Sequence, residues 1–173
     1  FEIDPGVECV SRALKQTGFA FMYAPRFHPA MKHAAGPRRE IGVRTVFNML
    51  GPLCNPAKVR RQIVGVFDRS RAREVAEVLA ALGSEHALVI SGPNGADELM
   101  PTGNNLLVEW DGKHVTERLM TPVELGVRPC GIAELRGGDA DTSATIIRSI
   151  VDGAIDSKSE TAVLNAGAAL YVA

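Results

Sequence analysis

The chain has 173 residues, a formal net charge of −1, 46% hydrophobic residues and 5% aromatic residues. This length suits one domain or two small ones and allows a core of useful size, so disorder is not expected. No apolar run approaches the roughly 20 residues that a membrane-spanning helix needs, and we expect a soluble cytoplasmic protein with no membrane partner.

Short helices and turns are predicted for the N-terminal part of the chain. Asp4 followed by Pro5 is typical of a helix N-cap and first helical position, and Gly18 ends the helical spacing that follows. Residues 19–23 form an apolar run that predicts a short strand or an extended segment. Further helical stretches are expected up to a break at Gly51-Pro52.

From residue 62 onward the pattern alternates between strand and helix. Residues 62–67 and 86–90 are predicted strands. A helix between them is predicted from an apolar stripe that consists of Val75, Val78, Leu79 and Leu82. These pieces make a βαβ unit with a parallel pair of strands, which places the fold in the α/β class.

A hairpin and three helices are expected in the C-terminal part. Asp111-Gly112 between two apolar runs is a strong signal for a tight hairpin turn. Thr121 and Glu124 have capping-box spacing and are predicted to open a short helix. Asp139, after two glycines, caps the next predicted helix, and the last one runs from about residue 160 to the end.

The near-zero net charge hides a segregation along the chain. Residues 26–73 carry 11 basic and 2 acidic side chains, a net charge of +9, whereas residues 74–173 carry 6 basic and 15 acidic side chains, a net charge of −9. A basic segment can be a solvated face, a nucleic-acid patch or a site for an anionic small molecule. The charge pattern alone leaves these alternatives open.

One pair of adjacent carboxylates, Asp97 and Glu98, lies in the segment 92–99 that directly follows a predicted strand. Loops at the carboxyl ends of strands in open α/β sheets are where ligands bind, and two carboxylates in such a loop can hold Mg²⁺ together with a substrate phosphate. The alternative is a solvated acidic turn. The pair is therefore a candidate magnesium site for a phosphorylated substrate.

Arg38 and Arg39 follow a predicted helix break at Gly36-Pro37. Because a guanidinium group binds a carboxylate or phosphate through two parallel hydrogen bonds, an arginine here can hold a small organic acid. The alternative is a pair of surface charges. No GxSxG motif and no CxxC pair occurs, so neither a catalytic nucleophile nor a zinc or disulfide framework is indicated.

Several segments, taken in order, resemble one family, anthranilate phosphoribosyltransferase. They are HPAMK at 28–32, RREIGVRTVFN at 38–48, GPLCNP at 51–56, GVFD at 65–68, the 97–98 pair with TG at 102–103, GGDA at 137–140 and LNAGAALY at 164–171. The resemblance spans nearly the whole chain, and Cys54 stands where the family commonly has threonine.

The resemblance implies transfer of a phosphoribosyl group from phosphoribosyl pyrophosphate to the amine of anthranilate, with Mg²⁺ as cofactor. It implies that Arg38 holds the anthranilate carboxylate, that His28 and Pro52 lie near the aromatic substrate, and that Asp97 and Glu98 are the magnesium ligands. It indicates no catalytic side chain. The family also implies a homodimer and no nucleic-acid partner.

The implied fold is α/β, with a mixed central sheet flanked by helices and a small helical segment belonging to a separate helical domain. Residues 1–25 would begin the α/β part, 26–60 would be the helical segment and 61–173 the catalytic α/β part. The family's GTGGD and KHGN segments do not occur in these residues. We therefore expect that the N-terminal half of the family is absent here and that the chain alone is inactive.

Two other functions remain open as alternatives. A nucleic-acid-binding relative of the same fold would use the +9 segment, although the balanced total charge and the carboxylate pair argue against it. A related pentosyltransferase acting on a nucleoside would bind a nucleobase, rather than anthranilate, near Arg38.

Overall fold

The computed structural model describes all residues except 1, 29–35, 37–39, 41 and 43–46, and it divides at Lys58 into two units, Phe1–Lys58 and Val59–Ala173. Each unit is considered by itself below. None of the helices among the described residues combines the length and apolar character that a membrane crossing requires.

Three helices are described in the unit Phe1–Lys58: α1 (Val7–Thr17), α2 (Ala24–Phe27) and α4 (Phe47–Leu53). The predicted cap at Asp4 is wrong, because Gly6 precedes α1 and the Asp4 carboxylate instead accepts hydrogen bonds from Arg26 Nε at 3.0 and 3.1 Å. The predicted end at Gly18 is confirmed by its left-handed backbone, with φ at 74°.

The other two predictions for this unit have different outcomes. Residues 19–23 lie in neither helix nor strand, which excludes the predicted strand and leaves the alternative of an extended segment. α4 continues through Gly51-Pro52 and ends at Leu53, so the predicted break before the proline is wrong by about one turn. Proline lacks the backbone donor that continues the hydrogen bonding of a helix, and α4 ends one residue after it.

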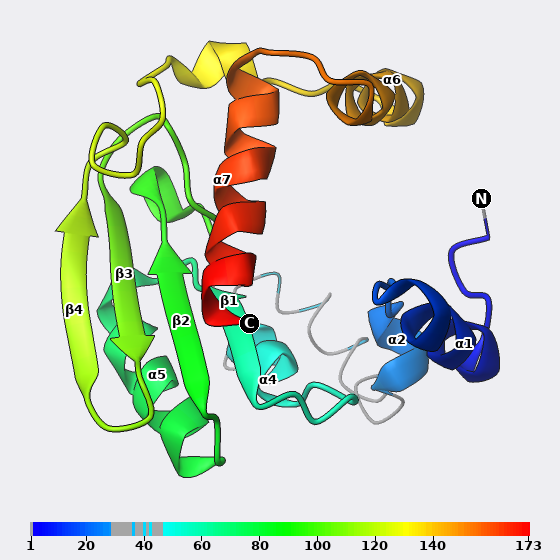
Figure 1. The fold of residues 1–173 in the computed structure, drawn as a ribbon, viewed down its shortest axis with the longest axis vertical. Coiled ribbons are helices and arrows are strands. Elements are labelled where there is room, and N and C mark those ends of the chain that lie inside the picture. Colours follow the sequence, from blue (N-terminus) through cyan, green and yellow to red (C-terminus); the bar gives the residue numbers. More distant parts are fainter. Residues whose placement is uncertain (1, 29–35, 37–39, 41, 43–46) are drawn as a thin grey trace. The chain divides into compact units, whose positions relative to one another are not determined.

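The unit Val59–Ala173 is built on a four-stranded mixed sheet (Figure 1). Its strands are β1 (Arg61–Gly65), β2 (His86–Ser91), β3 (Asn105–Trp110) and β4 (Val115–Met120), in that order. β1 and β2 are parallel, whereas β2–β3 and β3–β4 are antiparallel. The predicted α/β class with a mixed central sheet is confirmed, as are the βαβ unit and the hairpin.

The helices of this unit are α5 (Ala72–Ala81), α6 (Ala140–Val151) and α7 (Ser157–Val172), with short 3-10 turns η1 (Arg69–Arg71), η2 (Pro93–Gly95) and η3 (Ile132–Leu135). Asp139 caps α6 by accepting a hydrogen bond from the Thr142 N–H at 2.9 Å, as predicted. Thr121 and Glu124 do make capping-box hydrogen bonds, but a turn follows them rather than the predicted helix.

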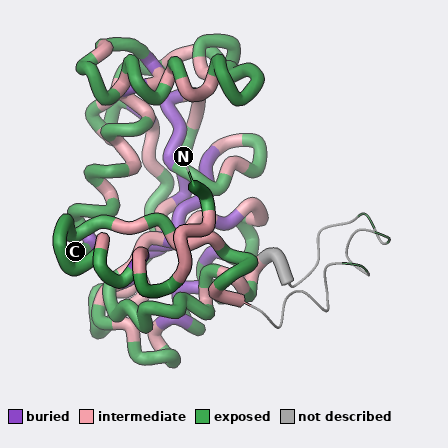
Figure 2. The backbone as a smooth tube through the Cα atoms, turned by 90° about the vertical axis from the view of Figure 1, so that its right-hand side faces the viewer, coloured by how far each residue is buried: buried purple, intermediate pink, exposed green. Residues whose placement is uncertain are grey.

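Helices cover both faces of the sheet (Figure 1). Side chains alternate along a strand, so Leu88 and Ile90 of β2 share one face, where they pack with Leu99 and with Val172 of α7. α5 contacts β2 and β3, and its buried side chains are Ala72, Val75, Ala76 and Leu79. Every residue of β2 from Ala87 to Ser91 is buried, and buried residues are purple in Figure 2.

The α5 stripe is shifted from the predicted one. Val78 and Leu82 were expected in the core, but they are 38% and 63% exposed. Two alanines, at 72 and 76, take their place on the buried face with no exposed surface. Small side chains let the helix lie close to the sheet, a preference that an apolar periodicity weighted toward large residues does not reveal.

A buried carboxylate ties α7 to three strands. Glu109 of β3 lies 2.9 Å from His86 Nε2 of β2 and accepts hydrogen bonds from Arg118 Nη2 of β4 and from the Tyr171 hydroxyl of α7, both at 2.8 Å. Burial by itself would raise the pKa of Glu109, but the hydrogen bonds from His86, Tyr171 and Arg118 outweigh it and hold that pKa below its usual value. These contacts give His86 a structural role.

Candidate functional site

Asp97 and Glu98 lie on the connection between β2 and β3, residues 92–104, which we call the acidic loop. Both side chains are exposed. The loop follows the carboxyl end of β2, as the sequence predicts. Among the described residues, neither carboxylate has a hydrogen-bond or ion-pair partner, so their oxygens are free to bind a ligand.

Two glycines allow the loop backbone to lie against the sheet. A Cβ added at Gly65, the last residue of β1, would overlap the carbonyl oxygen of Asp97. A Cβ at Gly92 would lie 2.5 Å from the carbonyl oxygen of Glu98, closer than Cβ atoms come in real structures. The close approach therefore requires glycine at both positions, and it seats the two acidic residues against the ends of β1 and β2.

Two asparagine side chains hold the peptide groups that follow the carboxylates. Asn165 of α7 accepts a hydrogen bond from the Leu99 N–H and donates one to the Leu99 carbonyl, both at 2.9 Å. Asn105 of β3 makes the same pair of contacts with Met100, at 2.8 and 2.9 Å. No local sequence pattern indicates these roles of Asn165 and Asn105, because each one acts through tertiary contacts.

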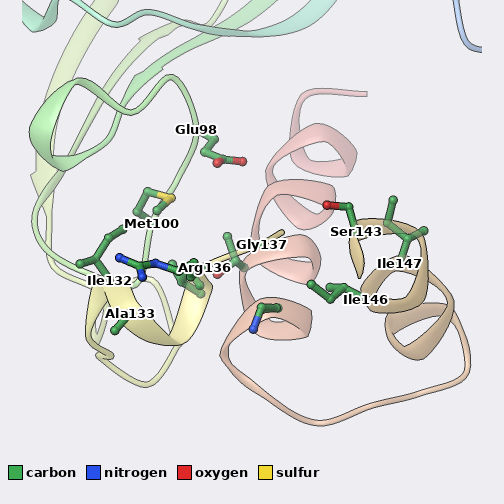
Figure 3. A pocket seen from close by; sticks show the side chains of 12 residues that line it. Glu98, Met100, Ile132, Ala133, Arg136, Gly137, Ser143, Ile146 and Ile147 are labelled. Atoms are coloured by element: carbon green, nitrogen blue, oxygen red, sulfur yellow. The ribbon is translucent and has the colours of Figure 1, made fainter. Parts of the chain in front are cut away.

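Glu98 also lines a pocket of about 540 Å³ formed within the unit Val59–Ala173 (Figure 3). Its apolar walls include Met100, Ile132, Ile146 and Ile147, and its polar positions are Glu98, Arg136, Ser143, Lys158 and Thr161. Figure 3 shows the Glu98 carboxylate extending from the acidic loop toward the helices. A carboxylate and two basic side chains around one pocket can bind a divalent cation and an anionic group side by side.

The donor set of the acidic loop fits Mg²⁺. Carboxylate oxygens are the hard ligands that this ion prefers, and Mg²⁺ is commonly held by one or two carboxylates plus water and substrate oxygens. Within the described residues, no group of three or more His, Cys, Asp or Glu side chains is arranged to hold a metal. Asp97 and Glu98 therefore suit a site that substrate oxygens and water complete, and not a closed structural one.

The predicted anthranilate site cannot be assembled from the described residues. Arg38 lies outside them. His28 follows α2 and its N–H donates to the Ala24 carbonyl at 2.9 Å, and Pro52 lies in the last turn of α4. Both belong to the unit Phe1–Lys58, so their roles near the aromatic substrate stay predictions.

A sequence model of the family described as "Glycosyl transferase family, a/b domain" matches residues 1–173. The chain belongs to the glycosyl transferase family. Among curated members, the anthranilate phosphoribosyltransferase of Mesorhizobium japonicum is 45% identical over 172 residues, which cover 99% of this chain and 51% of the relative. The chain thus spans about half the length of the curated relatives it matches, and it corresponds to their C-terminal portion.

Solved structures of the glycosyl transferase family agree with the fold. The anthranilate phosphoribosyltransferase of Thermus thermophilus superimposes with a TM-score of 0.91 at 39% identity, over 99% of this chain and 51% of that one. The Saccharomyces cerevisiae enzyme in complex with PRPP and Mg gives a TM-score of 0.80 at 26% identity, over 95% of this chain and 47% of that one. The resemblance seen in the sequence is confirmed.

Proposed function

We propose that this chain is the C-terminal part of an anthranilate phosphoribosyltransferase. The reaction transfers the phosphoribosyl group of phosphoribosyl pyrophosphate to the amine of anthranilate and releases pyrophosphate, a step of tryptophan biosynthesis. The observation that carries the proposal is the acidic loop, which presents two exposed carboxylates at the end of β2 in a chain that matches the family throughout. The yeast relative in complex with PRPP and Mg supports the same ligands.

Asp97 and Glu98 would hold Mg²⁺ in this enzyme. When bound, the ion supplies positive charge that stabilises the departing pyrophosphate. The chain's own contribution is to keep both carboxylates exposed and unpaired on a backbone that Gly65 and Gly92 seat against the sheet. Arg136 and Lys158 add positive charge around the pocket that Glu98 lines.

The reaction needs no nucleophilic side chain. The bond between the ribose anomeric carbon and the pyrophosphate oxygen breaks, a bond from the anthranilate nitrogen to that carbon forms, and the nitrogen loses a proton. Arg38 would orient anthranilate through its carboxylate. Positioning of the two substrates and stabilisation of the separating charges then account for the catalysis.

The proposal also includes the other features that the family resemblance implies. A homodimer, a cytoplasmic location and the absence of a nucleic-acid partner follow from the resemblance. So does the assignment of residues 26–60 to a helical domain, with residues 1–25 and 61–173 in the α/β part.

The isolated 173-residue chain is expected to be inactive. The relatives are about twice as long, and the glycine-rich GTGGD segment that the family uses for the diphosphate does not occur in these residues. The measurement is formation of phosphoribosyl anthranilate from both substrates with Mg²⁺, with a full-length relative as positive control. Substantial turnover by the chain alone would contradict the proposal that it is only a part of the enzyme.

Arg38→Ala, made in a protein that joins this chain to the remaining family sequence, should weaken anthranilate binding selectively. Loss of a bidentate bond to a charged carboxylate corresponds to roughly 1.5–3 kcal/mol, or about 10–150-fold in the KM for anthranilate. The KM for phosphoribosyl pyrophosphate should change little. Arg12→Ala, which removes a charge from α1, is the matched control, and an equal loss for both substrates would refute the assigned role.

A further inference from the structure

Asn165 and Asn105, which bind the backbone just after the two carboxylates, use their side-chain amides in the same way. Besides its two contacts with Leu99, Asn165 donates a second hydrogen bond to the Thr161 carbonyl at 2.9 Å. Besides its two contacts with Met100, Asn105 donates to the Gly103 carbonyl at 2.9 Å. Each amide thus has both of its donors engaged and one acceptor occupied, which fixes the orientation of the amide plane.

Leu99 and Met100 lie outside the sheet, and the two asparagine side chains make the hydrogen bonds that a neighbouring strand would otherwise supply. A side-chain amide carries a donor and an acceptor in one plane, as a neighbouring strand's peptide group would, so it can satisfy both polar groups of one residue. Leu99 is 1% exposed and Met100 is 8% exposed, so water cannot readily replace these bonds. Asn105 itself is fully buried, and Asn165 is half-buried.

The backbone that carries the two acidic residues is consequently fixed by two sets of contacts. The carbonyls of Asp97 and Glu98 lie against Gly65 and Gly92, and the next two peptide groups are bound by Asn165 and Asn105. The side chains of Asp97 and Glu98 themselves make no hydrogen bond or ion pair among the described residues. A fixed backbone that carries free carboxylates is what a preorganised metal site requires.

We infer that Asn165 and Asn105 are positioning residues that fix the direction in which Asp97 and Glu98 present their carboxylates to a divalent cation. The inference rests on the proposed function, because it takes the 97–98 pair as the metal ligands. It goes further by assigning α7 and β3 a part in metal binding, through the backbone and with no direct contact to the ion.

Hydrogen exchange in the unmodified chain tests the contacts themselves. The Leu99 and Met100 amides should exchange slowly, whereas the amide of Asn94, at the exposed tip of the same loop, should exchange quickly. In Asn165→Ala the Leu99 amide should lose protection while the Met100 amide keeps it, and Asn105→Ala should do the reverse. Rapid exchange of both amides in the unmodified chain would overturn the inference without any variant.

Binding of Mn²⁺, used as a paramagnetic substitute for Mg²⁺, tests the consequence. The ion should broaden amide resonances around residues 97 and 98 of the chain, and Asp97→Asn with Glu98→Gln should abolish the effect. Each asparagine variant should raise the Mn²⁺ dissociation constant roughly 10–100-fold, as loss of a group that orients a metal ligand does. Asn104→Ala, next to Asn105 but with an exposed side chain, is the control and should bind Mn²⁺ normally.

The outcomes separate this inference from the function on which it rests. If the unmodified chain shows no broadening that depends on Asp97 and Glu98, the metal assignment fails and the positioning role fails with it. If the broadening is present but the Mn²⁺ affinity is the same in both asparagine variants, the positioning role alone is refuted. Selective loss of affinity with the rest of the amide spectrum unchanged would support it.

Discussion

Gly65→Ala is expected to destabilise the unit Val59–Ala173 by about 3 kcal/mol, at the upper end of what overpacking costs. The new methyl group would occupy the position of the Asp97 carbonyl oxygen. A backbone carbonyl cannot rotate away as the end of a flexible side chain can, so either the acidic loop or the end of β1 has to move. Either movement breaks the contact that seats the Asp97 backbone against Gly65, and Mn²⁺ broadening at residues 97 and 98 should weaken as well.

Urea unfolding followed by circular dichroism measures the change, and Gly167→Ala provides the matched control. Gly167 lies inside α7, and a Cβ there meets nothing within 4 Å. Alanine is the better helix former by up to about 1 kcal/mol, so the control should be neutral or stabilising. An unfolding free energy for Gly65→Ala within about 0.5 kcal/mol of the unmodified chain would contradict the close contact described here.

Glu109→Gln is expected to cost about 3 kcal/mol of stability near neutral pH, because hydrogen bonds to a buried charged group contribute roughly 1.5–3 kcal/mol each and are not additive. The carboxylate accepts hydrogen bonds from Tyr171 and Arg118 and contacts His86. A glutamine has one acceptor oxygen, and its NH₂ group would face another donor. Loss of these bonds should loosen the C-terminal turn of α7 first.

The pH dependence of stability gives this prediction a second, independent readout. Hydrogen bonding holds the pKa of Glu109 below its usual value in the folded chain, so its contribution is fully present above the unfolded pKa of about 4.3. It is lost as the pH falls through the lower folded value. Glu109→Gln should therefore remove part of the acid destabilisation that the unmodified chain shows below about pH 4.3.

Glu117→Gln on β4 is the matched control for Glu109→Gln. Its side chain is exposed, and it lies next to Arg118 in β4 without joining the hydrogen bonds to Glu109. It should change stability by less than about 0.5 kcal/mol at any pH. If the two variants, Glu109→Gln and Glu117→Gln, gave the same unfolding curve as each other at pH 7 and again at pH 3.5, the stabilising role of the hydrogen bonds to Glu109 would be refuted.

Local patterns in the sequence predicted the secondary structure of the sheet and the place of the acidic loop. Alternating apolar segments identified β1, α5 and β2, and Asp111-Gly112 identified the β3–β4 hairpin. The position of Asp97 and Glu98 after a strand followed from the same pattern. These features depend on residues close together in the chain, and for that reason they are readable without a structure.

The contacts that complete the site depend on residues far apart in the chain. Asn165 binds a peptide group 66 positions away, and the close approach at Gly65 involves Asp97. A glycine in a strand or an asparagine in a helix has many possible roles, so neither residue type alone indicates its partner. The same limit explains the error at Asp4, whose carboxylate finds Arg26 instead of capping α1.

The acidic loop joins β2 directly to its antiparallel neighbour β3. One part of this loop can accept inserted residues, whereas another part cannot. Its tip, η2, is exposed at Asn94 and Gly95, and added residues there would cost little chain entropy because both ends are already anchored in the sheet. From residue 97 to 100 the backbone is held by the close approach to the two glycines and by the two asparagine side chains. An insertion there would therefore displace both carboxylates from their positions against the sheet. An engineer who wishes to graft a longer substrate-recognition segment onto this scaffold therefore has a permissive position only a few residues from an intolerant one.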